Sequence, residues 1–173
     1  AFNSNIVSDL SLYKGGIPSN YGGRTSSVLD VRLKEGSYEK WNFQASVGPL
    51  SSNVVIDGPL KKNKTSILLG FRASLSDFYL KYFPSPTVSK SKANFFDLNL
   101  KITQQVNAKN KLTFSYYQSG DQFKFGADTS YFWKTQTASF KFNSIINDKL
   151  SNNLLIFHSN YQYGIEGNKE NLG

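Results

Sequence analysis

The feature that most constrains this fold is an alternation of apolar and polar residues with a period of two, which recurs from Trp41 onward. It is clearest in residues 95–106, FFDLNLKITQQV, where Leu98, Leu100 and Ile102 alternate with polar residues. Successive side chains of a strand point to opposite faces of the sheet, so this pattern predicts strands with one apolar and one polar face. No stripe with helical spacing competes with it.

The alternation recurs in the segments 41–48, 65–75, 112–116, 138–143 and 155–163. Within 65–75, Ile67, Leu69 and Phe71 share one predicted face, with Ser66 and Arg72 on the other. In the next strand, Asn99 and Lys101 oppose the apolar residues named above. The polar faces consist mainly of Ser, Thr, Asn and Gln, as expected for a face exposed to water. His158, the one histidine, is expected on the polar face of the last strand.

The segments between the strands differ in length in an ordered way. Short polar connections at 61–64, 107–111 and 147–151 alternate with longer ones at 81–94 and 120–130. Because alternate connections of an antiparallel meander lie at opposite ends of the sheet, we expect all short turns at one end. Aromatic residues gather near the long-loop end, which is the arrangement that a bilayer interface selects.

These patterns favour a membrane β-barrel over a soluble β-sandwich, which also alternates and also uses polar turns. Several strands run well beyond the five or six residues that are typical of soluble sheets. In addition, a sandwich gives no reason for aromatic residues to gather at one end.

Charge and composition exclude several other classes. The net charge is +8, but the lysines are dispersed, so we do not expect nucleic acid as a partner. Cysteine is absent, and no cluster of metal ligands, nucleophile motif or paired carboxylates is evident. We therefore expect no enzymatic activity, no metal and no cofactor. A ligand role for His158 is a weaker alternative to a polar surface position.

Residues 12–36, LYKGGIPSNYGGRTSSVLDVRLKEG, read as two short strands joined by a loop rich in glycine. This stretch resembles the end of the plug domain of TonB-dependent outer-membrane receptors, especially the large receptors of Bacteroidetes-type bacteria. The residues that carry the resemblance are Lys14, Gly15, Gly16, Pro18, Tyr21, Gly22, Gly23, Arg24, Ser26, Ser27 and Asp30. Residues 43–80, including Asp57-Gly58-Pro59-Leu60, resemble the first barrel strands.

The resemblance implies a division of the chain at residue 36. Residues 1–36 would be the C-terminal part of the luminal plug, and residues 37–173 about the first seven strands of a transmembrane antiparallel β-barrel. Lys34, Glu35 and Gly36 would form the hinge between plug and wall. The family has 22 strands around the plug, so we expect this all-β chain to be a fragment of a receptor.

The resemblance also sets expectations for individual residues. The glycines at 15, 16, 22 and 23 would follow a tight path inside the barrel, so Gly22→Val would damage transport more than assembly. Arg24 and Asp30 would be candidates for salt bridges between plug and wall, with solvated charges as the alternative. Ile67, Leu69, Phe71, Leu98, Leu100 and Ile102 would face lipid, the short turns the periplasm and the long loops the exterior.

The function implied is active transport of a nutrient ligand across the bacterial outer membrane. Its partners would be outer-membrane lipid and lipopolysaccharide, the TonB energy-coupling complex and a surface lipoprotein. Siderophore, cobalamin, glycan and peptide ligands all remain open, as do the residues that bind them. The alternatives are a passive porin or structural outer-membrane barrel, and a soluble carbohydrate-binding β-domain.

Overall fold

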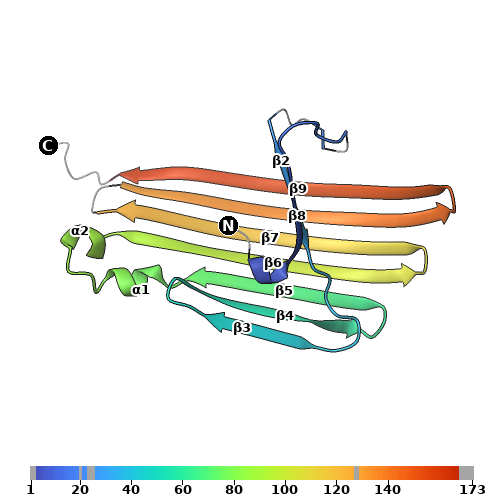
Figure 1. Ribbon diagram of the computed structural model, residues 1–173, viewed down its shortest axis with the longest axis horizontal. Coiled ribbons are helices and arrows are strands. Elements are labelled where there is room, and N and C mark those ends of the chain that lie inside the picture. The colour runs from blue at the N-terminus through green and yellow to red at the C-terminus, as the bar shows by residue number, and fades with distance from the viewer. Residues whose placement is uncertain (1–2, 20, 23–25, 127–128, 168–173) are drawn as a thin grey trace.

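The computed structural model describes residues 3–19, 21–22, 26–126 and 129–167 of the chain. The structure is mostly β, in two antiparallel sheets of two and seven strands (Figure 1). Its elements are η1 (Ser4–Ile6), β1 (Val7–Tyr13), β2 (Val28–Leu33), β3 (Asn42–Val47), β4 (Ser51–Lys61), β5 (Thr65–Ser74), α1 (Ser76–Leu80), α2 (Pro86–Ser89), β6 (Lys92–Asn107), β7 (Asn110–Phe125), β8 (Thr129–Asn147) and β9 (Leu150–Gly167).

The larger sheet is an antiparallel meander in which every strand pairs with its neighbour in sequence, in the order β3-β4-β5-β6-β7-β8-β9. The predicted β-strands are thus confirmed. The sheet is open, with β3 and β9 as its two edges, and it does not close into a barrel (Figure 1). The last four strands have 16, 16, 19 and 18 residues, about three times the usual length in soluble sheets.

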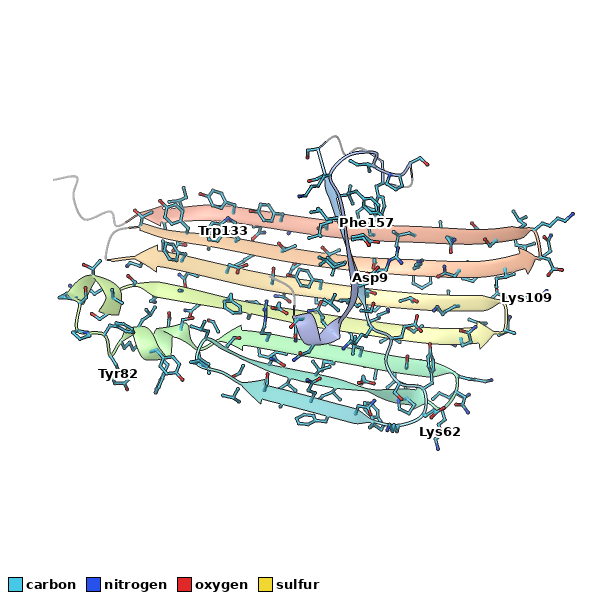
Figure 2. The ribbon with its side chains drawn as sticks, viewed as in Figure 1. Asp9, Lys62, Tyr82, Lys109, Trp133 and Phe157 are labelled. Carbon is cyan, nitrogen blue, oxygen red and sulfur yellow. The ribbon has the colours of Figure 1, made fainter. Side chains whose placement is uncertain are left out.

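The short connections are confirmed as tight turns. The turns at 108–109 and 148–149 have two residues each, and a three-residue turn at 62–64 contains Asn63 with φ 55°. Asparagine tolerates this left-handed conformation better than most residues, because its short polar side chain can hydrogen-bond locally. Lys62 and Lys109 mark the same end of the sheet, and Tyr82 and Trp133 lie toward the other (Figure 2).

The two predicted long loops differ from the structure. Residues 120–130 are mostly strand, because β7 runs to Phe125 and β8 begins at Thr129. Gly120 reads as a turn signal in sequence, but in the structure the ring of Phe96 from β6 lies over it within the sheet. Residues 81–94 include α2 and the start of β6. No helix in the described part of the chain has the length and apolar character to cross a membrane.

The two-stranded sheet is a hairpin of β1 and β2 that crosses one face of the larger sheet (Figure 1). The buried apolar core lies where η1 meets β4 and β5. It consists of Ile6, Val55 and Leu68, with the partly buried Leu33 packed against them. Only these three apolar side chains are buried among the described residues, so the hairpin and the sheet contact each other over a small area.

Candidate functional site: a two-faced sheet crossed by a hairpin

The strand register places the apolar residues of β5 and β6 on one face. Ile67 lies opposite Ile102, Leu69 opposite Leu100, and Phe71 opposite Leu98. Directly opposed residues of antiparallel strands share a face, so these six side chains form one apolar surface. Their predicted grouping is confirmed. The hairpin lies on the other face, so this surface points away from it.

The apolar surface continues over the other strands of the sheet. Its further members, by register, are Phe43, Ala45, Val47, Val54, Ile56, Phe96, Phe114, Tyr116, Phe132, Ala138, Phe140, Phe142, Leu154 and Ile156. Many of them are exposed: Phe71 by 43%, Phe140 by 41% and Ile156 by 60%. An exposed apolar surface of this extent is unusual on a monomeric soluble protein.

Aromatic rings cover glycines on this same apolar face. Trp41 lies over Gly58, Phe96 over Gly120 and Phe132 over Gly164, and a Cβ at any of these glycines would lie within 2.5 Å of the ring. A glycine within a strand often marks a site where another group approaches closely. These glycines make room for the rings of Phe96 in β6, Phe132 in β8 and Trp41, which directly precedes β3.

The opposite face of the sheet is mainly polar and carries the hairpin. Cross-strand pairs on this face are Ser66 with Thr103, Gly70 with Asn99, and Arg72 with Asp97. The predicted position of Ser66, Arg72, Asn99 and Lys101 opposite the apolar residues is confirmed. Asp97, Asn99, Thr103 and Ser66 are all buried. The face that the sequence predicts to be exposed to water is thus partly covered.

Three buried polar side-chain atoms lack a hydrogen-bond partner among the described residues: Asn3 Nδ2, Ser66 Oγ and Thr103 Oγ1. Ser66 and Thr103 are directly opposed on the face that carries the hairpin, and Asn3 caps η1 beside the same face. A buried polar atom without a partner costs about 1–3 kcal/mol. These three atoms are therefore left unpaired where the N-terminal segment meets the sheet.

Residues 3–6 pack against the larger sheet through the side chain of Ile6. This side chain is 1% exposed, and its Cγ2 lies 2.9 Å from the place that a Cβ of Gly70 would occupy. Asn3 caps η1 by accepting a hydrogen bond from the backbone N–H of Asn5 at 3.1 Å. The Asn5 side chain donates to Asn53 Oδ1 of β4 at 2.7 Å.

Polar contacts attach the end of the hairpin to the middle of the sheet. Lys101 Nζ donates to the backbone oxygen of Leu33 at 2.9 Å. Lys111 Nζ and Glu35 Oε1 are 2.6 Å apart and form the ion pair between the N-terminal segment and the sheet. The Lys111 side chain is 34% exposed and the Glu35 side chain 41%, so solvent weakens this ion pair.

Gly36 passes directly over the backbone of β5. A Cβ at this position would lie 2.2 Å from the carbonyl oxygen of Ile67, and Gly36 is buried. The next residue, Ser37, donates its backbone N–H to Asp57 Oδ2 at 2.8 Å. Residues 34–36 therefore lie where the chain leaves the hairpin and approaches the first strand of the sheet.

A second ion pair is built into the polar face. Arg72 Nη2 lies 2.6 Å from Asp97 Oδ2, and Arg72 Nε donates to the same oxygen at 2.7 Å. Asp97 is 2% exposed as a side chain, and Asn99 donates to its other oxygen at 3.3 Å. The Arg72 guanidinium also lies 5.0 Å from the centre of the Phe95 ring. The alternation assigns Arg72 and Asp97 each to the polar side of its strand, and only the register of β5 with β6 brings the two together.

Among the motif residues of the loop, Tyr21 and Asp30 are brought together. Their side chains are hydrogen-bonded, which raises the pKa of Tyr21 above its ordinary value, with a smaller effect of its limited desolvation. The Tyr21 ring also lies 5.7 Å from that of Tyr13, and its backbone N–H bonds to the oxygen of Pro18 at 3.0 Å. Tyr21 thus folds the glycine loop back onto the hairpin.

Of the two charged motif residues, Arg24 and Asp30, the structure describes Asp30. Asp30 contacts Arg32 of its own strand, at 3.1 Å from Nε, and not the larger sheet. The hydrogen bond to Asp30 raises the pKa of Arg32. Strand periodicity directs Asp30 and Arg32 to one side of the hairpin, so among the described residues Asp30 has its ion pair within its own strand, and a bridge from it to a barrel wall stays a prediction. Arg24 and Gly23 lie outside the described residues.

The loop glycines are not crowded. A Cβ at Gly15 or Gly22 would meet nothing within 4 Å, so the predicted tight path is wrong at these positions. Gly16 also has open space, but its φ of 59° favours glycine. Lys14, Ser26 and Ser27 are exposed, and Pro18 is half-buried. The close approach occurs at Gly36, outside the Tyr-Gly-Gly motif.

His158 does not lie on the polar face. It is opposite Ala138 of β8, whose face includes Phe140 and Phe142. The prediction is wrong because Leu154–Phe157 is apolar on both faces, so that local alternation cannot assign the side. Among the described residues, no group of three or more His, Cys, Asp or Glu side chains could hold a metal ion.

Aromatic side chains gather at the end opposite the short turns. Trp133 lies 6.4 Å from Tyr131, with the rings nearly parallel, and 5.7 Å from Tyr163 of β9. Phe78 of α1 contacts both Tyr79 and Tyr82 edge-on. The predicted gathering of aromatic residues near this end is therefore present in the structure.

Comparisons of the chain with protein-family models, with curated proteins and with solved structures find no match. The features of the chain that bear on function are the two faces of the sheet and the hairpin that crosses one of them.

Proposed function

We propose that this chain is part of a TonB-dependent transporter of the bacterial outer membrane. Residues 37–173 form a section of the barrel wall, and residues 1–36 form the C-terminal part of the luminal plug. The observation that carries the proposal is that one face of a long-stranded antiparallel sheet is apolar and exposed, while the other is polar and carries the N-terminal hairpin.

The apolar face has dimensions that suit a bilayer. On β6, Phe96 and Val106 are ten residue steps apart, with Leu98, Leu100, Ile102 and the polar Gln104 between them on the same side of the strand. At about 3.3 Å per residue and a tilt of about 40°, this run covers about 25 Å along the membrane normal. The apolar band of outer-membrane barrels has about the same height. Ile67, Leu69, Phe71, Leu98, Leu100 and Ile102 then face lipid.

The edges of the sheet set a further requirement. The backbone groups on the free sides of β3 and β9 have no strand partner in the larger sheet. Unpaired backbone groups are too costly to leave in hydrocarbon, so a sheet in a membrane must close. The proposal therefore requires further strands of the receptor to pair with these two edges.

The hairpin supports the assignment of a plug. Among the described residues, it contacts the polar face through one small apolar cluster, a few hydrogen bonds and one exposed ion pair. Contacts of this strength hold a segment in place and still allow it to move. In the proposed mechanism, the TonB complex pulls on the plug, and the movement opens a path for a nutrient ligand along the polar face.

The test uses cells that produce the complete receptor. Uptake is measured for a labelled ferric siderophore, cobalamin, an oligosaccharide and a peptide, with and without a protonophore that removes the energy supply. We expect the receptor in washed outer membranes and uptake of one compound that stops on uncoupling. Uptake that continues after uncoupling would identify a passive porin, and absence from the outer membrane would overturn the proposal.

A further inference from the structure

A cluster of four lysines lies at the end of the sheet opposite the short turns. Together with Asp77, Ser89, Ser91 and Gly126, they line a pocket of about 300 Å³. The lysines come from the α1–α2 region and from the adjoining strands β6 and β7, and we call them the lysine cluster: Lys81, Lys90, Lys92 and Lys124.

Positive charge in the lysine cluster is not balanced within the described part of the chain. Lys92 of β6 and Lys124 of β7 are directly opposed in the register, and like charges in this position destabilise a sheet. None of the four lysines takes part in an ion pair among the described residues. The one acid that lines the pocket, Asp77, accepts hydrogen bonds from the Ala93 N–H and from Asn94 Nδ2.

The lysine cluster lies at the border of the apolar face. Lys92 is on the same side of β6 as Phe96 and Leu98, with Asn94 between the charge and the first apolar ring. Lys124 is on the same side of β7 as Phe114. An anion that binds here approaches from the outside of the sheet and not from the face that carries the hairpin.

Exposed aromatic rings accompany the lysine cluster. Phe78 and Tyr82 at α1 are 61% and 75% exposed, and Phe83 is 54% exposed. Aromatic rings are enriched where hydrocarbon meets the head groups of a bilayer. Lysines next to such rings, just beyond an apolar band, are placed at the height of lipid phosphates.

We propose that the lysine cluster binds the phosphate groups of lipopolysaccharide in the outer leaflet. This inference rests on the proposed function, because it requires the apolar face to lie in the outer membrane with the α1–α2 end outside. The ammonium groups of Lys92 and Lys124 donate hydrogen bonds to phosphate oxygens, and the phosphate relieves the repulsion between the opposed lysines. The aromatic rings contact the upper part of the acyl chains.

The test uses the complete receptor in detergent and compares three probes: bisphosphorylated lipid A, lipid A without phosphates, and inorganic phosphate. Binding is followed by native mass spectrometry. Each lysine contributes about fivefold to attraction by an anionic surface, so we expect Lys92→Gln/Lys124→Gln to weaken binding of bisphosphorylated lipid A by about 25-fold. Lys109→Gln/Lys149→Gln, with the same charge change at the other end, should leave binding unchanged.

Each outcome decides the inference. Lys92→Arg/Lys124→Arg keeps the charge and should keep most of the binding, which separates loss of charge from loss of folding. Equal binding of all variants, equal binding of dephosphorylated lipid A, or competition by inorganic phosphate at similar concentration would overturn the lipid site. If the receptor inserts normally and only the lipid result fails, the proposed function stands; if it does not insert, both fail.

Discussion

Ile6 occupies the space that a side chain at position 70 would require: its Cγ2 lies 2.9 Å, and its Cδ1 3.2 Å, from the place of a Cβ on Gly70. Gly70 is the central residue of β5 on the face that carries the hairpin, and Asn99 lies opposite it. The absence of one side chain in the sheet therefore creates the seat for the N-terminal segment.

Gly70→Ala should loosen this seat. The added methyl group meets a buried branched side chain, and such overpacking costs about 1–3 kcal/mol. We expect faster hydrogen exchange and faster proteolysis in residues 3–7, with the strands of the larger sheet unaffected. Gly15→Ala is the matched control, because a Cβ there meets nothing within 4 Å. Equal protection of residues 3–7 in both variants would contradict the role of Gly70.

Gly36→Ala should be more damaging than Gly22→Ala. The Cβ at position 36 would lie 2.2 Å from a backbone oxygen of β5, which cannot move away without disturbing the sheet. Gly22 has open space around it. We expect Gly36→Ala to lower the yield of folded receptor in the outer membrane and Gly22→Ala to leave it unchanged. A similar yield for the two variants would show that the close approach at residue 36 is dispensable.

Asp97→Ala should destabilise the sheet by about 3–5 kcal/mol, since it leaves the largely buried guanidinium of Arg72 without this carboxylate. Arg72→Met/Asp97→Leu, which removes both charges, should be less damaging than Asp97→Ala alone. The measurement is a double-mutant cycle on the free energy of unfolding, with Arg72→Met, Asp97→Leu and the double variant that carries both.

The Glu35–Lys111 pair supplies the comparison for this cycle. It is much more exposed, and its coupling should be at most about 1 kcal/mol and should fall with added salt. Additive effects of the Arg72 and Asp97 substitutions would contradict a coupled pair on the polar face.

Tyr21 should ionise above the ordinary tyrosine pKa of 10.0. The neutral phenol is hydrogen-bonded to Asp30, so its contribution to loop docking is fully present below the ordinary pKa and is lost as pH rises through the raised one. Asp30→Asn should return the pKa toward its ordinary value. Titration of 13C-labelled tyrosine by NMR, with Tyr21→Phe to assign the signal, measures the shift. A Tyr21 pKa that Asp30→Asn leaves unchanged would rule out this contact.

Gly120→Val should displace the ring of Phe96. The glycine is covered by this ring on the apolar face, and a Cβ there would lie 2.5 Å from a ring carbon. We expect a loss of stability of about 1–3 kcal/mol in lipid or detergent. Phe96→Ala/Gly120→Val should recover part of this loss, because the smaller side chain makes room. A larger loss in the double variant would contradict direct contact as the cause.

Much of the sheet could be predicted from the sequence, because the period of two is a local property of a strand. The faces of β5 and β6 and the positions of the three short turns are examples. The prediction of which side chains share a face failed where the local sequence is compatible with either face. Leu154–Phe157 is apolar on both sides, so only the pairing of Ala138 with His158 decides the face of β9.

The sequence by itself determined that this chain forms long antiparallel strands with one apolar and one polar face. Tertiary structure alone decided what covers the polar face. Asp97 and Thr103 look like residues exposed to water, yet both are buried. Likewise, the open space at Gly22 and the crowding at Gly36 depend on where the chain crosses β5. Contacts between residues far apart in sequence follow from the packing of the hairpin on the sheet, which no local alternation encodes.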